Sequence, residues 1–373
     1  MEALMLPLNW QRVRLGDIGK PCMCKRVMKH QTTRYGEIPF YKIGTFGNTA
    51  DAFISKKLFL EYKTKYSFPK KGDILISASG TIGRAVIYDG KPAYFQDSNI
   101  VWIDNDETLV KNDFLFYVYS NVKWNTEHTT ILRLYNDNFR NTLIPLPPLN
   151  EQIAIANILS ALDRYLCALR ALILKKESVK KALSFELLSQ RKRLKGFNQA
   201  WQRVRLGDIA NYLTSNLSVE QITQQGKIKV YDVNNFIGYT DTTFISDKPY
   251  ISIVKDGSVG RVRILPPKTN ILSTMGALIA NHRTTTEFLF YLLSNFDFKN
   301  FTSGSIIPHI YFKDYKEKTI FLPPLNEQSA IANILSALDN EIISLKNKKR
   351  QFENIKKALN HDLMSAKIRV LEK

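Results

Sequence analysis

A chain of 373 residues is long enough for two domains with separate hydrophobic cores, and its 44% hydrophobic and 23% charged residues are ordinary for a globular protein. Its 53 lysines and arginines outnumber its 34 aspartates and glutamates, and the formal net charge of +19 favours a polyanionic partner such as nucleic acid. Three cysteines exclude a disulfide framework, no apolar run is long enough for a membrane span, and no export signal is visible, so we expect a cytoplasmic protein.

Two sequence repeats divide the chain. The segment Leu146–Asp163 (LPPLNEQIAIANILSALD) returns at Leu322–Asp339 with a single difference, at Ile153. The segment Trp10–Ile18 (WQRVRLGDI) returns unchanged at Trp201–Ile209. The chain therefore consists of two versions of one unit, and we expect an internal two-fold repeat of the fold.

The first version begins with a mixed α/β domain. Short β-rich runs follow its opening segment, separated by Gly, Pro, Asn and Asp; they are Ile38–Ile43, Asp73–Ser77, Arg84–Tyr88 and Asn99–Ile103. The segment Asp113–Asn121 (DFLFYVYSN) predicts a short buried helix rather than a base-stacking platform, because its aromatic residues fill every face.

The second version repeats this order with different residues. Lys227–Val233 corresponds to Ile38–Ile43, and Glu287–Asn295 (EFLFYLLSN) corresponds to Asp113–Asn121. Because the scaffold repeats while much of the surface chemistry does not, we expect the same fold with a different ligand preference.

Each α/β domain is followed by a long predicted helix. Pro147 and Pro148 cannot lie inside a helix, Asn150 is a good N-cap, and Glu151 is favourably placed in the first turn. Apolar residues then recur at the heptad spacing of a coiled-coil seam. In the first helix they are Ile155, Leu159, Leu162, Leu166, Leu169, Ile173, Leu183 and Leu187, and in the second Ile331, Leu335, Leu338, Ile342, Leu345, Phe352, Leu359 and Leu363.

The two helices are expected to pack on each other as an antiparallel coiled coil with one α/β domain at each end. Lysines interrupt the seams at Lys176, Lys180, Lys349 and Lys356, and the first helix is expected to end near Gly196. About 40 residues at about 1.5 Å each give a rod of about 60 Å, the length of roughly 18 base pairs. The predicted segments are α/β domains at 1–149 and 197–325 and helical spacers at 150–196 and 326–373.

The sequence offers no catalytic or metal-binding motif. The Pro-Pro pairs follow Leu146 and Leu322, not the Asn or Asp of a methyltransferase tetrapeptide. Gly80–Arg84 lacks the spacing and the lysine of a phosphate loop. Cys22 and Cys24 lack zinc spacing and have no second pair. We therefore expect neither an enzyme nor a metal protein.

Two features suit a nucleic-acid surface. The turns Gly80–Arg84 (GTIGR) and Gly257–Arg261 (GSVGR) let a backbone approach a phosphate, and their arginines can add charge or read guanine. A plain tight turn between strands remains the other interpretation. The polar loops around Arg133 and His309 occupy corresponding places with different residues, so we interpret them as specificity loops. The candidate DNA-binding residues are Lys42, Ser79, Thr81, Arg84, Arg133, Tyr135 and Asn138, and in the second unit Ser258, Arg261, His309, Tyr311 and Lys313.

The near-identity of the two helix starts extends beyond the seam positions that a coiled coil needs. Recent duplication fits badly with the diverged α/β domains, so we favour two identical docking surfaces for two copies of one partner. The candidate docking residues are Asn150, Glu151, Gln152, Asn157 and Asp163, with Asn326, Glu327, Gln328, Asn333 and Asp339 in the second copy.

On these residues the chain resembles the specificity subunit of type I restriction-modification enzymes. The paired LPPLNEQ–AIANILSALD segments, the paired WQRVRLGDI openings and the GDILIS…GTIGR run of Gly72–Arg84 carry the resemblance, which covers essentially the whole chain. The second domain departs from the GDILIS pattern, because Lys255 and Asp256 come directly before its turn. This departure leaves the DNA contacts of the second domain less well defined.

The resemblance implies two target recognition domains, each of which reads one half of a bipartite double-stranded DNA site. It implies an antiparallel coiled coil that sets the half-site spacing and docks two methylation subunits, with motor–nuclease subunits as further partners. S-adenosylmethionine, ATP and Mg²⁺ would belong to those partners, so no cofactor is expected here. Two other functions remain open: a stand-alone DNA-modifying enzyme, for which the sequence supplies no site, and a coiled-coil adaptor without a DNA role.

Overall fold

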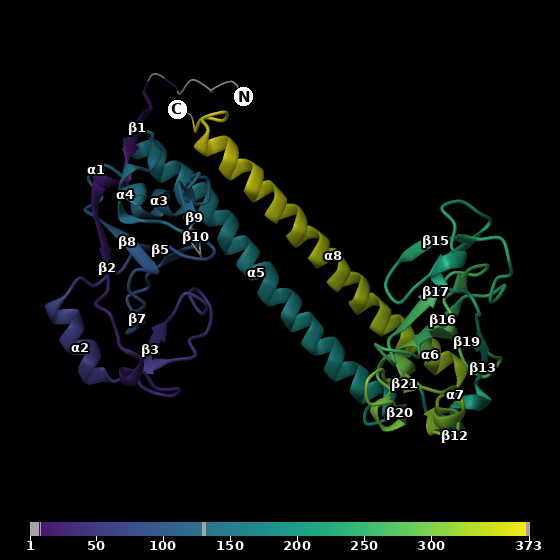
Figure 1. Cartoon of the computed structure of the whole chain (residues 1–373). Coiled ribbons are helices and arrows are strands. Elements are labelled where there is room, and N and C mark those ends of the chain that lie inside the picture. Colours follow the sequence, from purple (N-terminus) through teal and green to yellow (C-terminus); the bar gives the residue numbers. More distant parts are fainter. Residues whose placement is uncertain (1–6, 8, 129–131, 371–373) are drawn as a thin grey trace. The chain divides into compact units, whose positions relative to one another are not determined.

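The computed structural model describes residues 7, 9–128 and 132–370. It consists of two compact units, which we name unit 1 (Met1–Leu169 with Lys348–Lys373) and unit 2 (Arg170–Asn347). Each unit combines one α/β domain with parts of two long helices. Figure 1 labels strands of unit 1 up to β10 and strands of unit 2 from β12.

Unit 1 is built on a four-stranded antiparallel sheet. Its order is β2 (Gly19–Met23), β8 (Ile100–Asn105), β5 (Ile74–Ser77) and β6 (Ala85–Ile87). A smaller sheet has the order β4 (Phe53–Ile54), β3 (Ile38–Tyr41) and β7 (Tyr94–Phe95). Two strand pairs are β1 (Gln11–Arg14) with β11 (Leu143–Leu146), and β9 (Glu127–His128) with β10 (Leu132–Arg133). The short helices are α1 (Leu15–Ile18), α2 (Lys56–Lys65), α3 (Asn112–Tyr119) and α4 (Asn136–Asn141).

Unit 2 repeats this topology strand for strand, which confirms the predicted internal repeat. Its larger sheet has the order β13 (Ala210–Thr214), β19 (Met275–Ala280), β16 (Tyr250–Val254) and β17 (Val262–Leu265), and the smaller one β15 (Phe236–Thr240), β14 (Ile228–Tyr231) and β18 (Asn270–Ile271). The strand pairs are β12 (Gln202–Arg205) with β22 (Thr319–Leu322), and β20 (Thr302–Ser303) with β21 (His309–Ile310). Its short helices are α6 (Thr286–Ser294) and α7 (Phe312–Tyr315). Residues 241–249, all described, contain no helix in the place of α2.

The predicted aromatic helix of the first domain is confirmed as α3, and it forms the centre of the unit 1 core. Phe114 and Leu115 are at most 1% exposed and belong to one cluster with residues of β5 and β8. The same cluster includes Ile155 and Leu159, and Leu363 from the second long helix. Heptad residues at these helix ends therefore pack into the hydrophobic core of the domain, in addition to lying on the predicted coiled-coil seam.

The two long helices are α5 (Leu149–Leu188) and α8 (Leu325–Met364), each of 40 residues. The predicted end of the first helix near Gly196 is wrong, because α5 stops at Leu188. Gln190 adopts a φ of 61°, and this left-handed conformation ends the helical hydrogen-bonding pattern. Within the described ranges, neither helix nor any other is apolar enough over enough length to cross a membrane.

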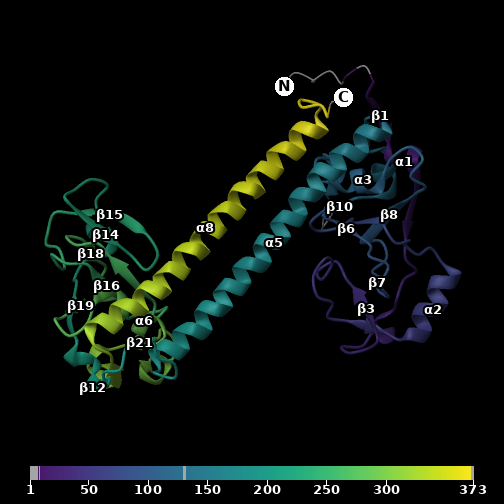
Figure 2. The same ribbon diagram turned by 180° about the vertical axis from the view of Figure 1, so that it is seen from behind.

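Lysines that interrupt the predicted seams pair with acids of the opposite helix. The pairs are Lys176–Glu341 and Lys180–Asp339 in unit 2 and Lys356–Asp163 in unit 1, with N–O distances of 2.8, 2.5 and 2.5 Å; Lys349 instead pairs with Glu353 on its own helix. Along these pairs the numbering of α5 rises while that of α8 falls, so the helices are antiparallel in unit 2. In unit 1, the last turns of α8 lie beside the first turns of α5 (Figure 1, Figure 2).

The aspartates of these pairs also bind the domain helices. Tyr117 Oη of α3 donates a hydrogen bond to Asp163 Oδ2 at 2.8 Å, and Tyr291 Oη of α6 donates one to Asp339 Oδ2 at 2.9 Å. Burial, and then the bond to the aspartate, raises the pKa of both phenols, so each tyrosine keeps the proton that it donates. Each aspartate thus joins a domain to both long helices.

A buried glutamate in the first turn of each long helix makes a second junction. In unit 1, Glu151 is 6% exposed; it accepts a hydrogen bond from Trp10 Nε1 at 3.0 Å and two from the Arg369 guanidinium, at 2.8 and 3.0 Å. In unit 2, fully buried Glu327 binds Trp201 Nε1 at 3.0 Å and the Arg193 guanidinium at 2.6 and 3.2 Å. Each arginine follows the end of the other long helix.

The neighbouring glutamine fixes the helix start to the domain. Gln152 is fully buried, and its amide donates to Pro147 O at 2.9 Å and Leu109 O at 3.1 Å while it accepts from Lys111 N at 2.8 Å. Gln328 makes the corresponding bonds in unit 2. These contacts satisfy polar groups that would be costly to bury alone.

Replacement of Glu151 by alanine is expected to destabilise unit 1 by about 2–4 kcal/mol, because it removes charge-assisted hydrogen bonds and leaves the indole N–H of Trp10 without its acceptor. Glu327→Ala is expected to do the same to unit 2. Denaturant unfolding of the full chain measures both effects. Glu317→Ala serves as control, since its ion pair with Arg205 is solvent-exposed and contributes at most about 1 kcal/mol. Equal stability losses for Glu151→Ala and Glu317→Ala would contradict the assignment.

Candidate DNA interface

In unit 1 the glycine turn and the segment around Arg133 lie side by side. Leu134 N donates a hydrogen bond to Ala78 O at 2.9 Å, and Ser79 forms an antiparallel β-bridge with Arg133. The two features that the sequence suggested separately therefore form one surface. The predicted polar loop is in fact the strand β10 followed by the short helix α4.

Asn99 connects these two features. Ser79 Oγ donates to Asn99 Oδ1 at 2.7 Å, and the Arg133 guanidinium donates to the same oxygen at 3.5 Å. Ser79 is 6% exposed, so the structure does not support it as a direct DNA contact. Its hydroxyl instead holds the amide that orients Arg133.

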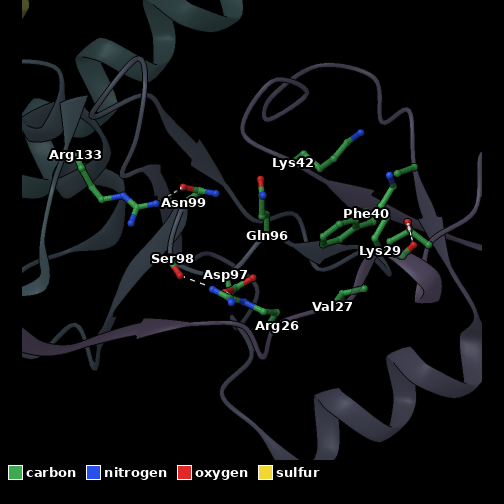
Figure 3. Close-up of a pocket in the computed structure, with 12 residues that line it drawn as sticks. Arg26, Val27, Lys29, Phe40, Lys42, Gln96, Asp97, Ser98, Asn99 and Arg133 are labelled. Atoms are coloured by element: carbon green, nitrogen blue, oxygen red, sulfur yellow. Dashed lines mark hydrogen bonds and ion pairs between the residues drawn. The ribbon is translucent and has the colours of Figure 1, made fainter. Parts of the chain in front are cut away.

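A polar pocket of about 510 Å³ opens next to this pair. Figure 3 shows Arg133 and Asn99 on one side of it, Lys29, Phe40 and Lys42 on the other, and Gln96 between them. Its remaining lining residues are Arg26, Val27, Thr32, Ala52, Asp97 and Ser98. The pocket therefore brings together two of the predicted DNA-binding residues, Lys42 and Arg133.

Sequence analysis missed the other polar groups of this pocket, chiefly Arg26, Lys29, Gln96 and Asn99. They come from the 3₁₀ turn Lys29–Gln31 with its preceding segment, and from the connection between β7 and β8. The sequence does contain a signal for Arg26 and Lys29. The basic run around Arg26, which follows the first WQRVRLGDI segment, has no counterpart after the second one.

Positive charge dominates the pocket wall. Four of its lining residues are basic and one, Asp97, is acidic; Asp97 Oδ2 lies 2.8 Å from Arg26 Nε. Lys42 forms a largely exposed ion pair with Asp51, at 2.8 Å, and such pairs contribute little stability and are easily exchanged for another anion. The pocket suits a phosphate, or a guanine edge that accepts two hydrogen bonds.

The other predicted residues of unit 1 surround this surface. Thr81 is exposed at the turn, and Tyr135 is 39% exposed just before α4. The Arg84 guanidinium lies 3.4 Å from Gly47 O and 3.3 Å from Asn48 Oδ1, so it supports the loop that follows β3. Asn138 is half-buried within α4.

Unit 2 assembles its predicted residues in the same manner. Asp256 forms an antiparallel β-bridge with His309, and His309 Nδ1 lies 2.6 Å from Asp256 Oδ1. The rings of His309 and Tyr311 are roughly parallel, with centroids 6.5 Å apart, and Lys313 Nζ lies 5.5 Å above the Tyr311 ring. Ser258 and Arg261, both within the glycine turn Gly257–Arg261, are exposed.

Equivalent positions in the two units carry different chemistry. Because the strand registers and 3₁₀ turns of the two units match, each position in unit 1 has a counterpart in unit 2. The counterparts of the four basic residues Arg26, Lys29, Lys42 and Arg133 are Asn216, Val219, Asp232 and His309. In place of four basic residues, unit 2 therefore has an amide, an apolar side chain, an acid and a histidine at these positions.

The candidate docking residues fall into two groups. Six of them, Glu151, Gln152, Asp163, Glu327, Gln328 and Asp339, make the intramolecular junctions described above, and four of these, the glutamates and glutamines, are buried. Their identity in the two copies is accounted for by these contacts, without a partner. The other four, Asn150, Asn157, Asn326 and Asn333, are exposed on the helix surface.

Comparison of the sequence with known proteins shows the family of this chain. The family model described as "Type I restriction modification DNA specificity domain" matches residues 7–177 and again 198–354. A putative type I restriction enzyme specificity subunit of Haemophilus influenzae is 62% identical over 152 residues, which are 40% of each chain. The MjaX and MjaVIII specificity subunits of Methanocaldococcus jannaschii, the first of them named as putative, are 29% and 26% identical over 98% and 99% of this chain and 95% of their own.

Two solved structures share the fold over nearly the whole chain. The S subunit of a type I restriction-modification system from M. genitalium has a TM-score of 0.66 at 20% identity and covers 97% of this chain and 98% of its own. A structure described for complex assembly and conformational transition of the type I R-M system has a TM-score of 0.58 at 17% identity, over 96% and 98%. At these identities the likeness concerns the fold alone.

The glycine turn offers a test of how this surface is held. Gly83 has a φ of 81°, and a Cβ there would lie 2.1 Å from Trp124 Nε1, whereas Gly80 has a φ of 67° with no atom within 4 Å of such a Cβ. Gly80→Ala is expected to cost about 1 kcal/mol from the left-handed backbone alone. Gly83→Ala is expected to cost about 2 kcal/mol more, because Trp124 must move. Denaturant unfolding compares them, and equal losses would contradict the packing.

Proposed function

Because the chain belongs to the family of type I restriction-modification DNA specificity proteins, we propose that its two units read the two halves of a bipartite double-stranded DNA site. The family is one of DNA recognition, and this chain is a specificity subunit rather than an enzyme. The observation that carries the proposal is the contrast between the units. Identical topology with different side chains at equivalent positions is what a reader of two unlike half-sites requires.

Unit 1 would contact its half-site through the basic pocket. Arg133 sits at the rim, oriented by Asn99, and a guanidinium can bind O6 and N7 of guanine with two hydrogen bonds. Lys42 can exchange its exposed partner Asp51 for a phosphate, which fixes the register of the protein on the duplex. Phosphate contacts position the domain, and base-edge contacts supply the specificity.

Unit 2 would read its half-site with fewer charges. Its equivalent of Arg133 is His309, which is paired with Asp256 and followed by exposed Tyr311 and Lys313. Histidine and tyrosine can donate or accept hydrogen bonds at base edges, and Lys313 supplies a phosphate contact. The expected half-site therefore differs in sequence from that of unit 1.

The long helices α5 and α8 would set the spacing between the half-sites and dock two methylation subunits. On the first turns of each, a stripe of exposed residues repeats almost unchanged. In α5 it is Asn150, Ile153, Asn157, Ile158 and Ala161, and in α8 Asn326, Ser329, Asn333, Ile334 and Ala337. Ile334 is half-buried and the others are exposed. Asn150 Oδ1 and Asn326 Oδ1 each accept a hydrogen bond from the next backbone N–H, at 2.9 Å, so the docking argument rests on the exposed pairs Asn157/Asn333 and Ala161/Ala337.

The assembled enzyme would also include motor–nuclease subunits and act in the cytoplasm. S-adenosylmethionine, ATP and Mg²⁺ would bind the partner subunits. A stand-alone DNA-modifying enzyme and a coiled-coil adaptor are the competing functions. Methylation by the purified chain alone would support the first, and absence of sequence-specific DNA binding would support the second.

Arg133→Ala is expected to relax the base requirement at one position of the half-site read by unit 1, with a loss of about 10- to 100-fold in affinity for the original sequence. His309→Ala is expected to alter only the other half-site. The measurement is methylation mapping of genomic DNA after co-expression of each variant with the methylation subunit. A contiguous motif, or changes in both halves from one substitution, would contradict the proposal.

Docking can be tested on the exposed stripe. Asn157→Arg places a long charged side chain on the stripe of α5 and is expected to leave one of two methylation subunits bound; Asn333→Arg removes the other, and the double variant removes both. Ser178→Arg is the control, because Ser178 is exposed on α5 outside the repeated stretch. Native mass spectrometry of the co-purified complex counts the subunits. Two subunits retained by the double variant would refute this docking site.

A further inference from the structure

A pair of exposed isoleucines stands at the tip of the β20–β21 hairpin in unit 2. Ile306 is 91% exposed and Ile307 is 55% exposed. Ile306 is the most exposed of the large hydrophobic side chains that the structure describes. Exposure of a whole isoleucine side chain costs hydrophobic free energy, so folding of unit 2 does not explain why isoleucine stands at the tip.

The base of this hairpin is firmly attached to unit 2. Gly257 N donates to Pro308 O at 2.8 Å, and Ile310 N donates to Lys255 O at 2.9 Å. Phe301, just before β20, packs with Phe296 and Tyr315, and Ile310 is 1% exposed in the same core cluster. The hairpin thus presents its tip from a rigid base.

The tip is shaped by its own sequence. Gly304 has a φ of 89°, and a Cβ at this position would lie 2.3 Å from Ile307 O, so only glycine allows the chain to fold back here. Ser303 pairs with His309 across the hairpin. Five residues, 304–308, therefore project from the strands, with Ile306 at their centre.

The surroundings of the tip match DNA better than a protein partner. The hairpin is continuous with the proposed DNA surface, because His309 lies in its second strand and Tyr311 and Lys313 follow that strand. Lys299, shortly before β20, is exposed, and so is Arg261, in the glycine turn whose Gly257 N binds Pro308 O. Asp256, the acid that faces the hairpin, is paired with His309. Two isoleucines expose far less area than the roughly 800 Å² per partner that a stable protein interface buries.

We propose that Ile306 is an apolar wedge that enters the base stack of the half-site read by unit 2 and unstacks one base-pair step. Apolar side chains that project from a rigid element between basic residues insert into base steps in this way, and the apolar contact offsets part of the cost of unstacking. Ile307, the next residue and 55% exposed, would cover the displaced edge. Steps of low stacking energy are then favoured at that position without a hydrogen bond to either base.

This inference rests on the proposed function, and its experiment separates the two. The full chain, co-purified with its methylation subunit, is mixed with duplexes that carry its mapped target and one fluorescent base analogue, moved through the unit 2 half-site. Wild-type protein is expected to raise the fluorescence several-fold at one step. Ile306→Ala is expected to abolish the rise while sequence-specific binding falls by less than about 10-fold, and Ile306→Leu is expected to retain it.

Ile343→Ala is the matched control, since Ile343 is 55% exposed on α8 in the same unit, and it is expected to leave the signal unchanged. Sequence-specific binding without any fluorescence rise, or a rise that survives Ile306→Ala, overturns the wedge and leaves the proposed function standing. Loss of specific binding beyond 100-fold in correctly folded Ile306→Ala assigns the residue to base contact and also overturns the wedge. Absence of specific binding by the wild-type protein overturns the proposed function itself.

Discussion

The structure depends on one constraint: a carboxylate buried in the first turn of each long helix must be satisfied. Glu151 and Glu327 each lie between a tryptophan indole, directly before the first strand of a domain, and an arginine guanidinium. A buried charge without partners costs several kcal/mol, so the first strand, the helix start and the arginine must come together for the unit to fold. Because Arg369 follows α8 and Arg193 follows α5, each domain is completed by the helix that the other domain launches. Because both units have this requirement, the LPPLNEQ sequence that contains the glutamate occurs in both.

On that shared frame the two units present different chemistry. The β-bridge that joins the glycine turn to the next hairpin carries Ser79 and Arg133 in unit 1 and Asp256 and His309 in unit 2. The backbone hydrogen bonds that hold it are the same, so side chains there can change without loss of the fold. Positive charge follows the same division, since the four basic residues of the unit 1 pocket have Asn216, Val219, Asp232 and His309 as counterparts in unit 2. A recognition protein built in this way can alter one half-site while the other, and the junctions to the helices, stay as they are.

The sequence predicted what depends on local pattern and on repetition. The repeats, the strands β3, β5, β6 and β8, the aromatic helices and the two long helices follow from spacing and turn residues, whereas β10 was expected to be a loop. The end of α5 was misjudged, because Gln190 takes the left-handed conformation that the prediction reserved for Gly196. The junction that Glu151 makes was not predicted either, because nothing local shows that Trp10, 141 positions earlier, supplies its hydrogen bond. Arg26 and Asn99 were missed for the same reason, since their meeting at one pocket is a tertiary event.

The central claim is that each unit reads its half-site independently on a common frame, and a chimera tests it most directly. The chain in which residues 201–322 replace residues 10–146 keeps the Trp–Glu–Arg junctions, because both segments begin with the same WQRVRLGDI sequence and end before the same Pro-Pro pair. Methylation mapping of this chimera, co-expressed with the methylation subunit, is predicted to give an inverted repeat of the unit 2 half-site. An asymmetric motif that still contains the original unit 1 half would contradict the account.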